Sequence, residues 1–253
     1  MNTVLCVQDL CKRYPGFLLD HVSFSLVPHR IMGLIGKNGA GKSTTLKAML
    51  NMVSPESGRV TVFQQDFYQQ ETACKARIGV VFGGMEFYPL KTLAAITAVT
   101  KRFYAHWDQA QYQRYLGYFG LDERKKFKEL SNGMKVKYLL TLALSHHAEL
   151  LILDEPTSGL DPVSRDELLH LFRQIVEGEH CSILFSTHIT SDLDKCADDI
   201  TYLQNGKVLQ SADKETFLRS FDHLRAPGDT MPLTLEEIML RTERRTWDDE
   251  AAL

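Results

Sequence analysis

Residues that could bind and cleave phosphates occur first in a glycine-rich stretch between Gly36 and Thr44. The stretch follows the pattern G-x-x-x-x-G-K-[ST], with Lys42 and Ser43 at the last two defined positions. Glycine tolerates positive backbone angles and lets backbone N–H groups approach phosphate oxygens closely. The charge of Lys42 suits the β- and γ-phosphates, and the hydroxyl of Ser43 is an oxygen ligand of the kind that Mg²⁺ prefers. The pattern therefore predicts a nucleotide site.

A second set of chemical groups is the carboxylate pair Asp154 and Glu155. The pair follows four aliphatic residues, 150–153, that are typical of a buried strand, and α/β sheets bind ligands at the carboxyl ends of such strands. We expect Asp154 to belong to the Mg²⁺ shell and Glu155 to orient and polarise the attacking water. One acidic residue after a strand is usually an ordinary loop residue. Two of them downstream of a phosphate loop favour nucleotide hydrolysis.

Apolar patterning indicates the elements that must position these groups. Residues 31–35 are typical of a buried strand that leads into the phosphate loop, and residues 45–50 favour a helix that leaves it. Further strands are predicted at 3–10, 22–27, 58–63, 150–153 and 182–185, with a central parallel strand at 78–82. Residues 200–204 and 207–210 flank Asn205-Gly206, a strong hairpin signal. Helices are predicted at 92–105, 109–119, 163–177 and 234–245, and a turn at 12–16.

Three further motifs lie in a fixed order around the carboxylate pair. They are Leu130-Ser131-Asn132-Gly133-Met134 before it, Ser158-Gly159-Leu160-Asp161 after it, and Ser186-Thr187-His188 at the end of the next apolar run. With these motifs the sequence resembles the nucleotide-binding subunit of ATP-binding cassette (ABC) transporters, over about residues 3 to 215. The resemblance implies an α/β fold of the P-loop NTPase type, with a RecA-like core, an N-terminal antiparallel β region and an inserted helical subdomain at about residues 86–147. It implies an ABC domain over residues 1–225 and a short charged extension over 226–253.

The resemblance also implies a role for each motif residue in an ATP-driven, head-to-tail dimer. Tyr14 would stack on adenine, and Ser43 would ligate Mg²⁺ directly while Asp154 acts through water. Glu155 and His188 would be catalytic, because His188 would link the γ-phosphate to Glu155. The phosphates would be surrounded by Asn38, Gly39, Ala40, Gly41, Lys42, Ser43 and Thr44. The residues that reach the partner's ATP or lie at the dimer seam would be Ser131, Asn132, Gly133 and Asp161.

The sequence departs from the family pattern at two places. Asn132 and Met134 replace a glycine and a glutamine of the usual signature, and asparagine tolerates left-handed backbone well. More consequential is Gly83, which stands where the family has a glutamine that contacts Mg²⁺ and the attacking water. Either a water takes the place of that side chain or Glu86 reaches in, and the sequence leaves both open.

Composition limits the setting in which such an ATPase works. The 253 residues carry a formal net charge of −3, which gives no electrostatic basis for binding nucleic acid. Five cysteines without a C-x-x-C pair suggest reduced thiols. No apolar run approaches the roughly 18 residues of a membrane span, and no secretory signal is apparent. We therefore expect a cytoplasmic protein, and the family resemblance implies a separate multi-span permease subunit that holds it at the membrane.

The local sequences of residues 78–89, 144–147 and 186–193 resemble one branch of the ABC family more specifically. This branch is the bacterial ABC-2-type exporters, which include exporters of antimicrobial or amphipathic peptides. The sequence thus favours an ATPase subunit of an exporter. The alternative is a soluble ABC protein acting on DNA or ribosomes, although the interval between phosphate loop and signature shows no sustained heptads and the chain has one cassette. A small-molecule kinase is disfavoured by the signature and His188. The cargo, the direction of transport and the choice between homodimer and heterodimer stay open.

Overall fold

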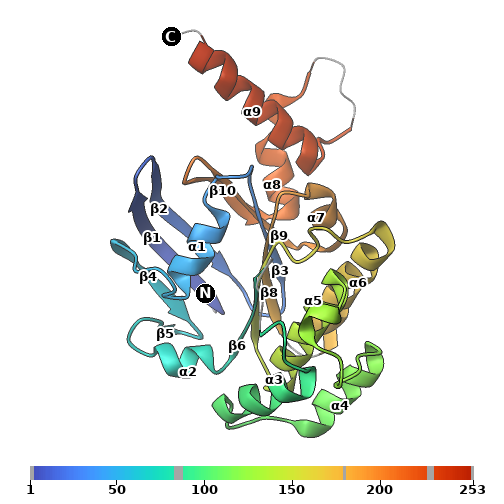
Figure 1. Cartoon of the computed structure of the whole chain (residues 1–253). Helices are drawn as coiled ribbons and strands as arrows, with labels where there is room; N and C mark the ends of the chain where they lie inside the picture. Colours follow the sequence, from blue (N-terminus) through green and yellow to red (C-terminus); the bar gives the residue numbers. More distant parts are fainter. Residues whose placement is uncertain (1–2, 83–87, 179–180, 227–230, 252–253) are drawn as a thin grey trace.

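The computed structural model describes residues 3–82, 88–178, 181–226 and 231–251, and its elements form two sheets with helices around them (Figure 1). The strands are β1 (Leu5–Tyr14), β2 (Phe17–Leu26), β3 (Ile31–Ile35), β4 (Ser57–Val62), β5 (Gln65–Asp66), β6 (Ile78–Phe82), β7 (Leu150–Asp154), β8 (Ser182–Thr187), β9 (Asp199–Gln204) and β10 (Lys207–Asp213). The α-helices are α1 (Lys42–Met49), α2 (Glu71–Lys75), α3 (Leu93–Thr100), α4 (Gln109–Tyr118), α5 (Asn132–Ser145), α6 (Pro162–Gly178), α7 (Thr190–Cys196), α8 (Lys214–Ser220) and α9 (Leu235–Ala251). Short 3-10 helices span Lys101–Phe103, Phe127–Glu129 and Asp222–Leu224.

The larger sheet has the strand order β10-β9-β3-β8-β7-β6 and is parallel except for β10. Its inner strands are apolar on both faces because both faces are covered. In β3, Ile31 and Ile35 belong to a core shared with α5, α6 and α7, whereas Met32 and Leu34 belong to a core on the opposite face. This alternation follows from the two-residue period of a strand, and it seats the sheet between two hydrophobic layers.

The second core lies between the parallel sheet and the smaller antiparallel sheet, whose strand order is β2-β1-β4-β5. Helix α1 contributes Leu46, Ala48 and Met49 to this layer. Figure 1 shows α1 between the two sheets, with the antiparallel sheet in blue and cyan at one side of the molecule. The helix that follows the phosphate loop is therefore fixed by apolar contacts on both sides.

A third core belongs to the helical subdomain formed by α3, α4 and α5. It contains Leu93, Ile96, Leu116, Phe127 and Leu142 and is separate from the two sheet cores. At its centre the Thr97 hydroxyl lies 2.9 Å from the hydroxyls of both Tyr112 and Tyr138. A buried hydroxyl needs such partners, because leaving one unpaired costs about 1–3 kcal/mol.

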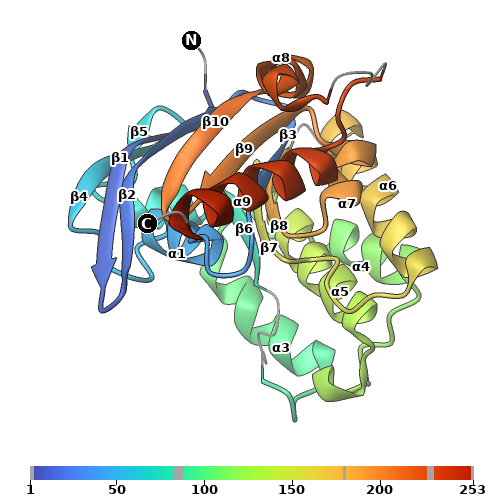
Figure 2. The ribbon, with the colours of Figure 1, turned by 90° about the horizontal axis from the view of Figure 1, so that it is seen from above.

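The C-terminal helix α9 packs on the parallel-sheet side of the molecule. Its Leu235 and Ile238 are buried in the same core as α6 and α7. Further along α9, the Glu243 carboxylate lies 2.9 Å from the Lys37 Nζ and accepts a hydrogen bond from the buried Tyr202 hydroxyl at 3.1 Å. Figure 2 shows α9 crossing above the sheet toward α1. The end of the described chain thus contacts the phosphate loop.

The structure confirms the predicted fold class and most elements, with two corrections. The predicted turn at 12–16 is wrong over its first part, because β1 continues to Tyr14 and pairs with Phe17, which leaves Pro15 and Gly16 as the turn. The strand at 78–82 is parallel as predicted, but it is the edge strand of its sheet and not a central one. It is nevertheless largely buried, since α5 packs against it.

Candidate nucleotide site

A cavity of about 430 Å³ lies at the carboxyl end of β3, where the phosphate loop turns into α1. It is lined by Phe17, Asn38, Gly39, Gly41, Lys42, Ser43, Thr44 and Glu155. The first backbone N–H groups of a helix have no partner within that helix. Lys42, Ser43 and Thr44 supply these groups here and all line the cavity, so the positive end of the α1 dipole faces it.

The loop is held in shape by its own backbone and by a distant hairpin. Gly39 and Gly41 have positive φ angles, and a Cβ added to Gly41 would lie 2.8 Å from the Phe17 ring. The Gly206 N–H donates to the Ala40 carbonyl at 3.0 Å. Gly206 has to be glycine, because a Cβ there would lie 1.9 Å from the Leu18 carbonyl oxygen. These backbone angles and this hydrogen bond therefore hold the loop in shape.

Lys42 is buried and its ammonium is fully engaged. Its Nζ donates to the Gly36 carbonyl at 2.8 Å and the Lys37 carbonyl at 3.3 Å, and lies 3.6 Å from Glu155 Oε1. Burial lowers the pKa of Lys42, and the carboxylates of Glu155 and Asp154 oppose that shift. A phosphate entering the cavity would add negative charge beside this ammonium and favour its protonated form.

Asp154 and Glu155 end β7 but differ in their surroundings. Asp154 is buried, and the Ser186 hydroxyl of the neighbouring strand β8 donates to its Oδ1. Glu155 is half-buried and has a φ of 49°, a left-handed conformation that is uncommon outside glycine. Its N–H donates to the Ser186 carbonyl at 3.0 Å. Such backbone strain clusters at functional sites, and here it places the side chain in the cavity.

His188 follows the next strand, β8, and meets Glu155. The His188 Nδ1 lies 2.9 Å from Glu155 Oε2, so one carboxylate oxygen faces the histidine while the other faces Lys42. The imidazole is exposed at the rim. The structure therefore brings together Lys42, Glu155 and His188, which were predicted to contact the γ-phosphate or to orient the water that attacks it. We refer to residues 36–44 with Asp154, Glu155 and His188 as the phosphate set.

At the predicted adenine position, Tyr14 is exposed at the end of β1, with Lys12 Nζ 5.4 Å from the centre of its ring. The aromatic residue that lines the cavity from this hairpin is Phe17, which pairs with Tyr14 in the strand register. Phe17 was not predicted from the sequence, because the predicted strand ended at residue 10. Had that prediction extended to Tyr14, as β1 does, the two-residue turn would have placed Phe17 opposite Tyr14.

The residues predicted to serve a neighbouring chain form a second group, which we call the signature set: Ser131, Asn132, Gly133 and Asp161. Ser131 caps α5 by accepting the Met134 N–H at 3.3 Å, and Asp161 caps α6 by accepting the Val163 and Ser164 N–H groups at 3.1 and 3.0 Å. The hydrogen bonds from Ser164 hold the pKa of Asp161 below its ordinary value. Ser131, Asn132 and Asp161 are exposed. Two helix N-termini are thus presented together to solvent.

Gly83 and Glu86 lie outside the described residues, so the proposed substitution for the missing glutamine stays a prediction. Among the described residues, a groove of about 360 Å³ lies between β6 and the helical subdomain. Its walls are mostly apolar and come from β6, α5 and the end of α3, including Phe82, Leu139 and Tyr104. The buried His146 stacks on Tyr104 at 3.8 Å, and burial lowers the pKa of His146 to about 4.

The parallel sheet, the phosphate loop at the start of α1 and the carboxylates at the end of β7 define the class of P-loop nucleotide-binding proteins. Residues 19–158 match the ABC transporter family, and the chain belongs to that family. The fold agrees with a solved structure described as "Structure of ATP binding subunit of ABC transporter". The two superpose with a TM-score of 0.82 at 27% identity, over 95% of this chain and all of that one.

Two curated relatives are similar over most of this chain. The "Bacitracin transport ATP-binding protein BcrA" of Bacillus licheniformis is 30% identical over 228 residues, which cover 89% of this chain and 72% of that protein. The "Linearmycin resistance ATP-binding protein LnrL" of Bacillus subtilis (strain 168) is 33% identical over 234 residues, covering 90% of this chain and 73% of that protein.

The chain is therefore the ATP-binding subunit of an ABC transporter, and it binds ATP and hydrolyses it to power transport. ABC ATPase subunits dimerise and work with membrane permease partners. Among the described residues, no helix combines the length and the apolar character that crossing a membrane requires.

Proposed function

We propose that this subunit powers the export of amphipathic or peptide antibiotics through a separate membrane subunit. The proposal is supported by the named relatives, one a bacitracin transport protein and one a linearmycin resistance protein, each aligned over about nine tenths of this chain. It is supported further by the local sequences of residues 78–89, 144–147 and 186–193, which resemble those of ABC-2-type exporters. The observation that carries the hydrolytic part is Glu155, which lies between Lys42 and His188.

In this proposal Glu155 is the general base. The attacking water gives its proton to the Glu155 carboxylate, and His188 holds Oε2 so that the carboxylate keeps one orientation. Lys42 exchanges part of its contact with the Gly36 and Lys37 carbonyls for the γ-phosphate. The N–H groups of residues 39–44 receive the remaining phosphate charge, as a preorganised site requires.

The residues at the loop also suit Mg²⁺. The donors are the Ser43 hydroxyl and the Asp154 carboxylate, hard oxygen ligands that leave room for the several waters Mg²⁺ keeps. Asp154 fits a role in this shell because Ser186 engages Oδ1, which fixes the carboxylate in orientation while it stays buried. Ser43 would be the direct side-chain ligand of the ion, which would neutralise charge on the β- and γ-phosphates.

The signature set completes the site of a second copy or a closely related ATPase chain. Supporting this is the exposure of Ser131, Asn132 and Asp161 at two adjacent helix N-termini, which can hold an anion that another molecule brings. The membrane subunit would place a short helix in the groove between β6, α5 and α3. That groove is supported by its apolar walls and by its contact with both the sheet and the helical subdomain.

The test is a strain in which Lys42→Ala replaces the native residue, with Lys47→Ala as the control, since Lys47 is exposed on the same helix. We expect the Lys42→Ala strain to be inhibited by lower concentrations of peptide antibiotics such as bacitracin, and the Lys47→Ala strain to match wild type. Unchanged sensitivity to the whole antibiotic panel, with ATPase activity lost in the purified variant, would reject peptide export while leaving the ATPase assignment intact.

A further inference from the structure

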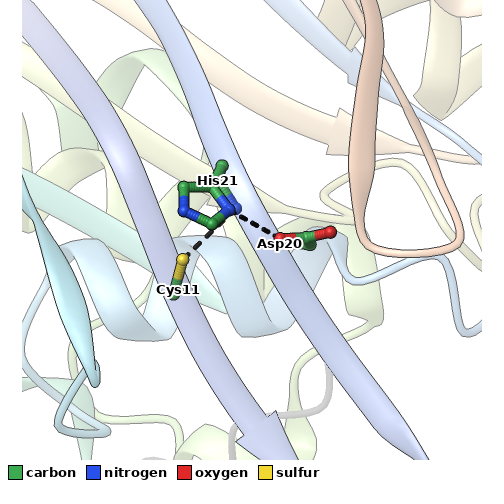
Figure 3. Close-up of side chains that lie close together, drawn as sticks. All are labelled: Cys11, Asp20 and His21. Carbon is green, nitrogen blue, oxygen red and sulfur yellow. Dashed lines mark hydrogen bonds and ion pairs between the residues drawn. The ribbon is translucent and has the colours of Figure 1, made fainter.

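A cluster of metal-ligating side chains lies in the antiparallel sheet, among residues that the nucleotide site does not use. Cys11 comes from β1, and Asp20 and His21 come from β2 (Figure 3). A ligand atom from each of the three lies within 4.8 Å of the others. None of the three lines the nucleotide cavity.

The local strand pairing explains why these side chains meet. Leu10 pairs with Val22 and Lys12 with Leu19, so Cys11 alone faces the two residues Asp20 and His21. This is a β-bulge, in which two residues of one strand oppose one of the other. Consecutive strand side chains ordinarily point to opposite faces. The positive φ of His21, 48°, breaks that alternation and brings its ring beside Asp20 and Cys11.

The three residues already contact one another through hydrogen bonds. The His21 N–H donates to Cys11 Sγ at 3.3 Å, and the Cys11 thiol donates to the Asp9 carbonyl at 3.5 Å. His21 Nδ1 lies 2.6 Å from Asp20 Oδ1, and Lys207 Nζ lies 3.0 Å from Asp20 Oδ2. The His21 side chain is 70% exposed, which opens the cluster to ions in solution.

We propose that Cys11, Asp20 and His21 form a Zn²⁺ site. A thiolate, an imidazole and a carboxylate are the three ligand types that Zn²⁺ takes in proteins, and water would complete a tetrahedral set. The thiol of Cys11 releases its proton to solvent on binding, as a Zn²⁺ ligand must. Mg²⁺ and Ca²⁺ select oxygen ligands, so the sulfur argues against both.

The geometry requires a small adjustment. Two ligands of one tetrahedral Zn²⁺ ion lie about 3.4 Å apart when each bond is near 2.1 Å. The contact between His21 Nδ1 and Asp20 Oδ1 must therefore widen from 2.6 Å as the ion replaces the proton between them. The exposed ring can rotate for this, and its proton moves to Nε2. Lys207 can keep Oδ2 while Oδ1 faces the ion.

The experiment titrates the full chain, free of nucleotide, with Zn²⁺ against a chromophoric chelator, and with Co²⁺ followed by absorbance. A thiolate ligand gives Co²⁺ a sulfur-to-metal charge-transfer band that nitrogen and oxygen ligands do not give. We expect one Zn²⁺ per chain and this band in the wild type. Cys11→Ser should abolish the band and weaken Zn²⁺ binding at least tenfold, since even outer-shell changes cost about 10–100-fold.

Two further variants keep the test independent of folding. Cys6→Ser removes a thiol from the same strand at a regular ladder position opposite Ser25 and should behave as wild type. His21→Asn keeps a residue that tolerates left-handed backbone but removes the ring, and should also weaken binding at least tenfold. Zn²⁺ binding that persists unchanged in Cys11→Ser and His21→Asn, or a band that is lost in Cys6→Ser, would overturn the proposal. So would the absence of one-to-one binding in the wild type.

Discussion

The phosphate set and the signature set are held in contrasting ways. Residues of the phosphate set follow β3, β7 and β8, strands buried on both faces between two cores. The signature set stands in solvent at the N-termini of α5 and α6, and α5 belongs in part to a helical subdomain with its own core. The residues proposed to bind this chain's own phosphates are therefore fixed in place between two cores. Three of the residues proposed to serve a neighbour, Ser131, Asn132 and Gly133, lie instead on or next to a helix shared with a separately packed subdomain, and only Asp161 lies on a helix of the sheet core.

Helix α5 is the joint between these regions. Its Tyr138 and Leu142 are buried in the helical subdomain, and its Leu140 and Leu144 are buried against the parallel sheet. The apolar groove is lined by α5 and by β6 together. A partner bound in that groove would contact both regions at once. Such binding could therefore change the position of the helical subdomain relative to the parallel sheet.

The largest expected effect follows from Glu155→Gln in the phosphate set. The variant should bind ATP as the wild type does and hydrolyse it at least about 100-fold more slowly, because the amide cannot take the proton of water. The measurement is steady-state ATPase activity together with nucleotide affinity. The control is Glu177→Gln, an exposed carboxylate paired with Arg173 on α6. Wild-type turnover in Glu155→Gln would remove Glu155 from the site.

Tyr138→Phe tests whether the helical subdomain is energetically separate. The variant loses a buried hydroxyl that bonds Thr97 and donates to the Leu93 carbonyl at 3.1 Å, so unfolding should cost about 1–3 kcal/mol less. Urea unfolding gives this difference, and Tyr118→Phe, at an exposed position of α4, is the control. Nucleotide affinity should stay unchanged. If ATP affinity fell together with stability, the core of the helical subdomain would not be energetically separate from the sheet cores that hold the phosphate set.

Ser131→Ala distinguishes a capping role from a role in a neighbour's site. Losing the cap of α5 should destabilise the chain by about 1 kcal/mol, and losing a phosphate contact should slow hydrolysis about tenfold. Thr92→Ala is the matched control, because Thr92 caps α3 by accepting the Ala95 N–H at 3.2 Å. Both variants should lose similar stability in thermal unfolding, but only Ser131→Ala should lower the ATPase rate of the dimer. Equal rates would confine Ser131 to capping.

The smallest expected effect concerns α9. Glu243→Gln removes a negative charge 2.9 Å from Lys37 and leaves that ammonium free to attract the phosphates. We expect ATP to bind about twofold tighter at low ionic strength, because partly exposed ion pairs contribute little interaction free energy. This gain in affinity should vanish in high salt, which screens the charges. Glu236→Gln, an exposed residue at the start of α9, makes the same charge change away from the loop. Equal affinity of the two variants would show that the contact leaves binding unaffected.

Local signals sufficed for most of the fold because each element carries its own period and its own turn residues. Local signals failed where pairing between strands decides how far a strand extends or where it lies in the sheet. Residues 12–14 are polar and precede Pro15-Gly16, so they resemble a turn, yet cross-strand pairing with β2 extends the strand through them. Burial of residues 78–82 was visible in the sequence, but the order of strands in a sheet depends on long-range pairing.

The residues of the nucleotide site differ in the same way: some were predicted from local motifs, and others depend on long-range contacts. Lys42 and Glu155 were predicted from the phosphate-loop pattern and the carboxylate pair, and His188 from the family resemblance. The structure places the three side chains next to one another. Sequence reasoning missed Phe17 and Glu243, since their places follow from a strand register and from a helix more than two hundred residues after the loop. The Cys11 cluster was equally hidden, because strand alternation predicts that neighbours such as Asp20 and His21 diverge.

The neighbours of the phosphate loop also set an order for folding during synthesis. The loop leaves the ribosome early, but β3 pairs with β8 and β9, Ala40 accepts its hydrogen bond from Gly206, and Lys37 meets Glu243. Contacts of such high sequence separation form slowly. The nascent chain must therefore wait for its last third before the loop acquires all the contacts that hold its shape.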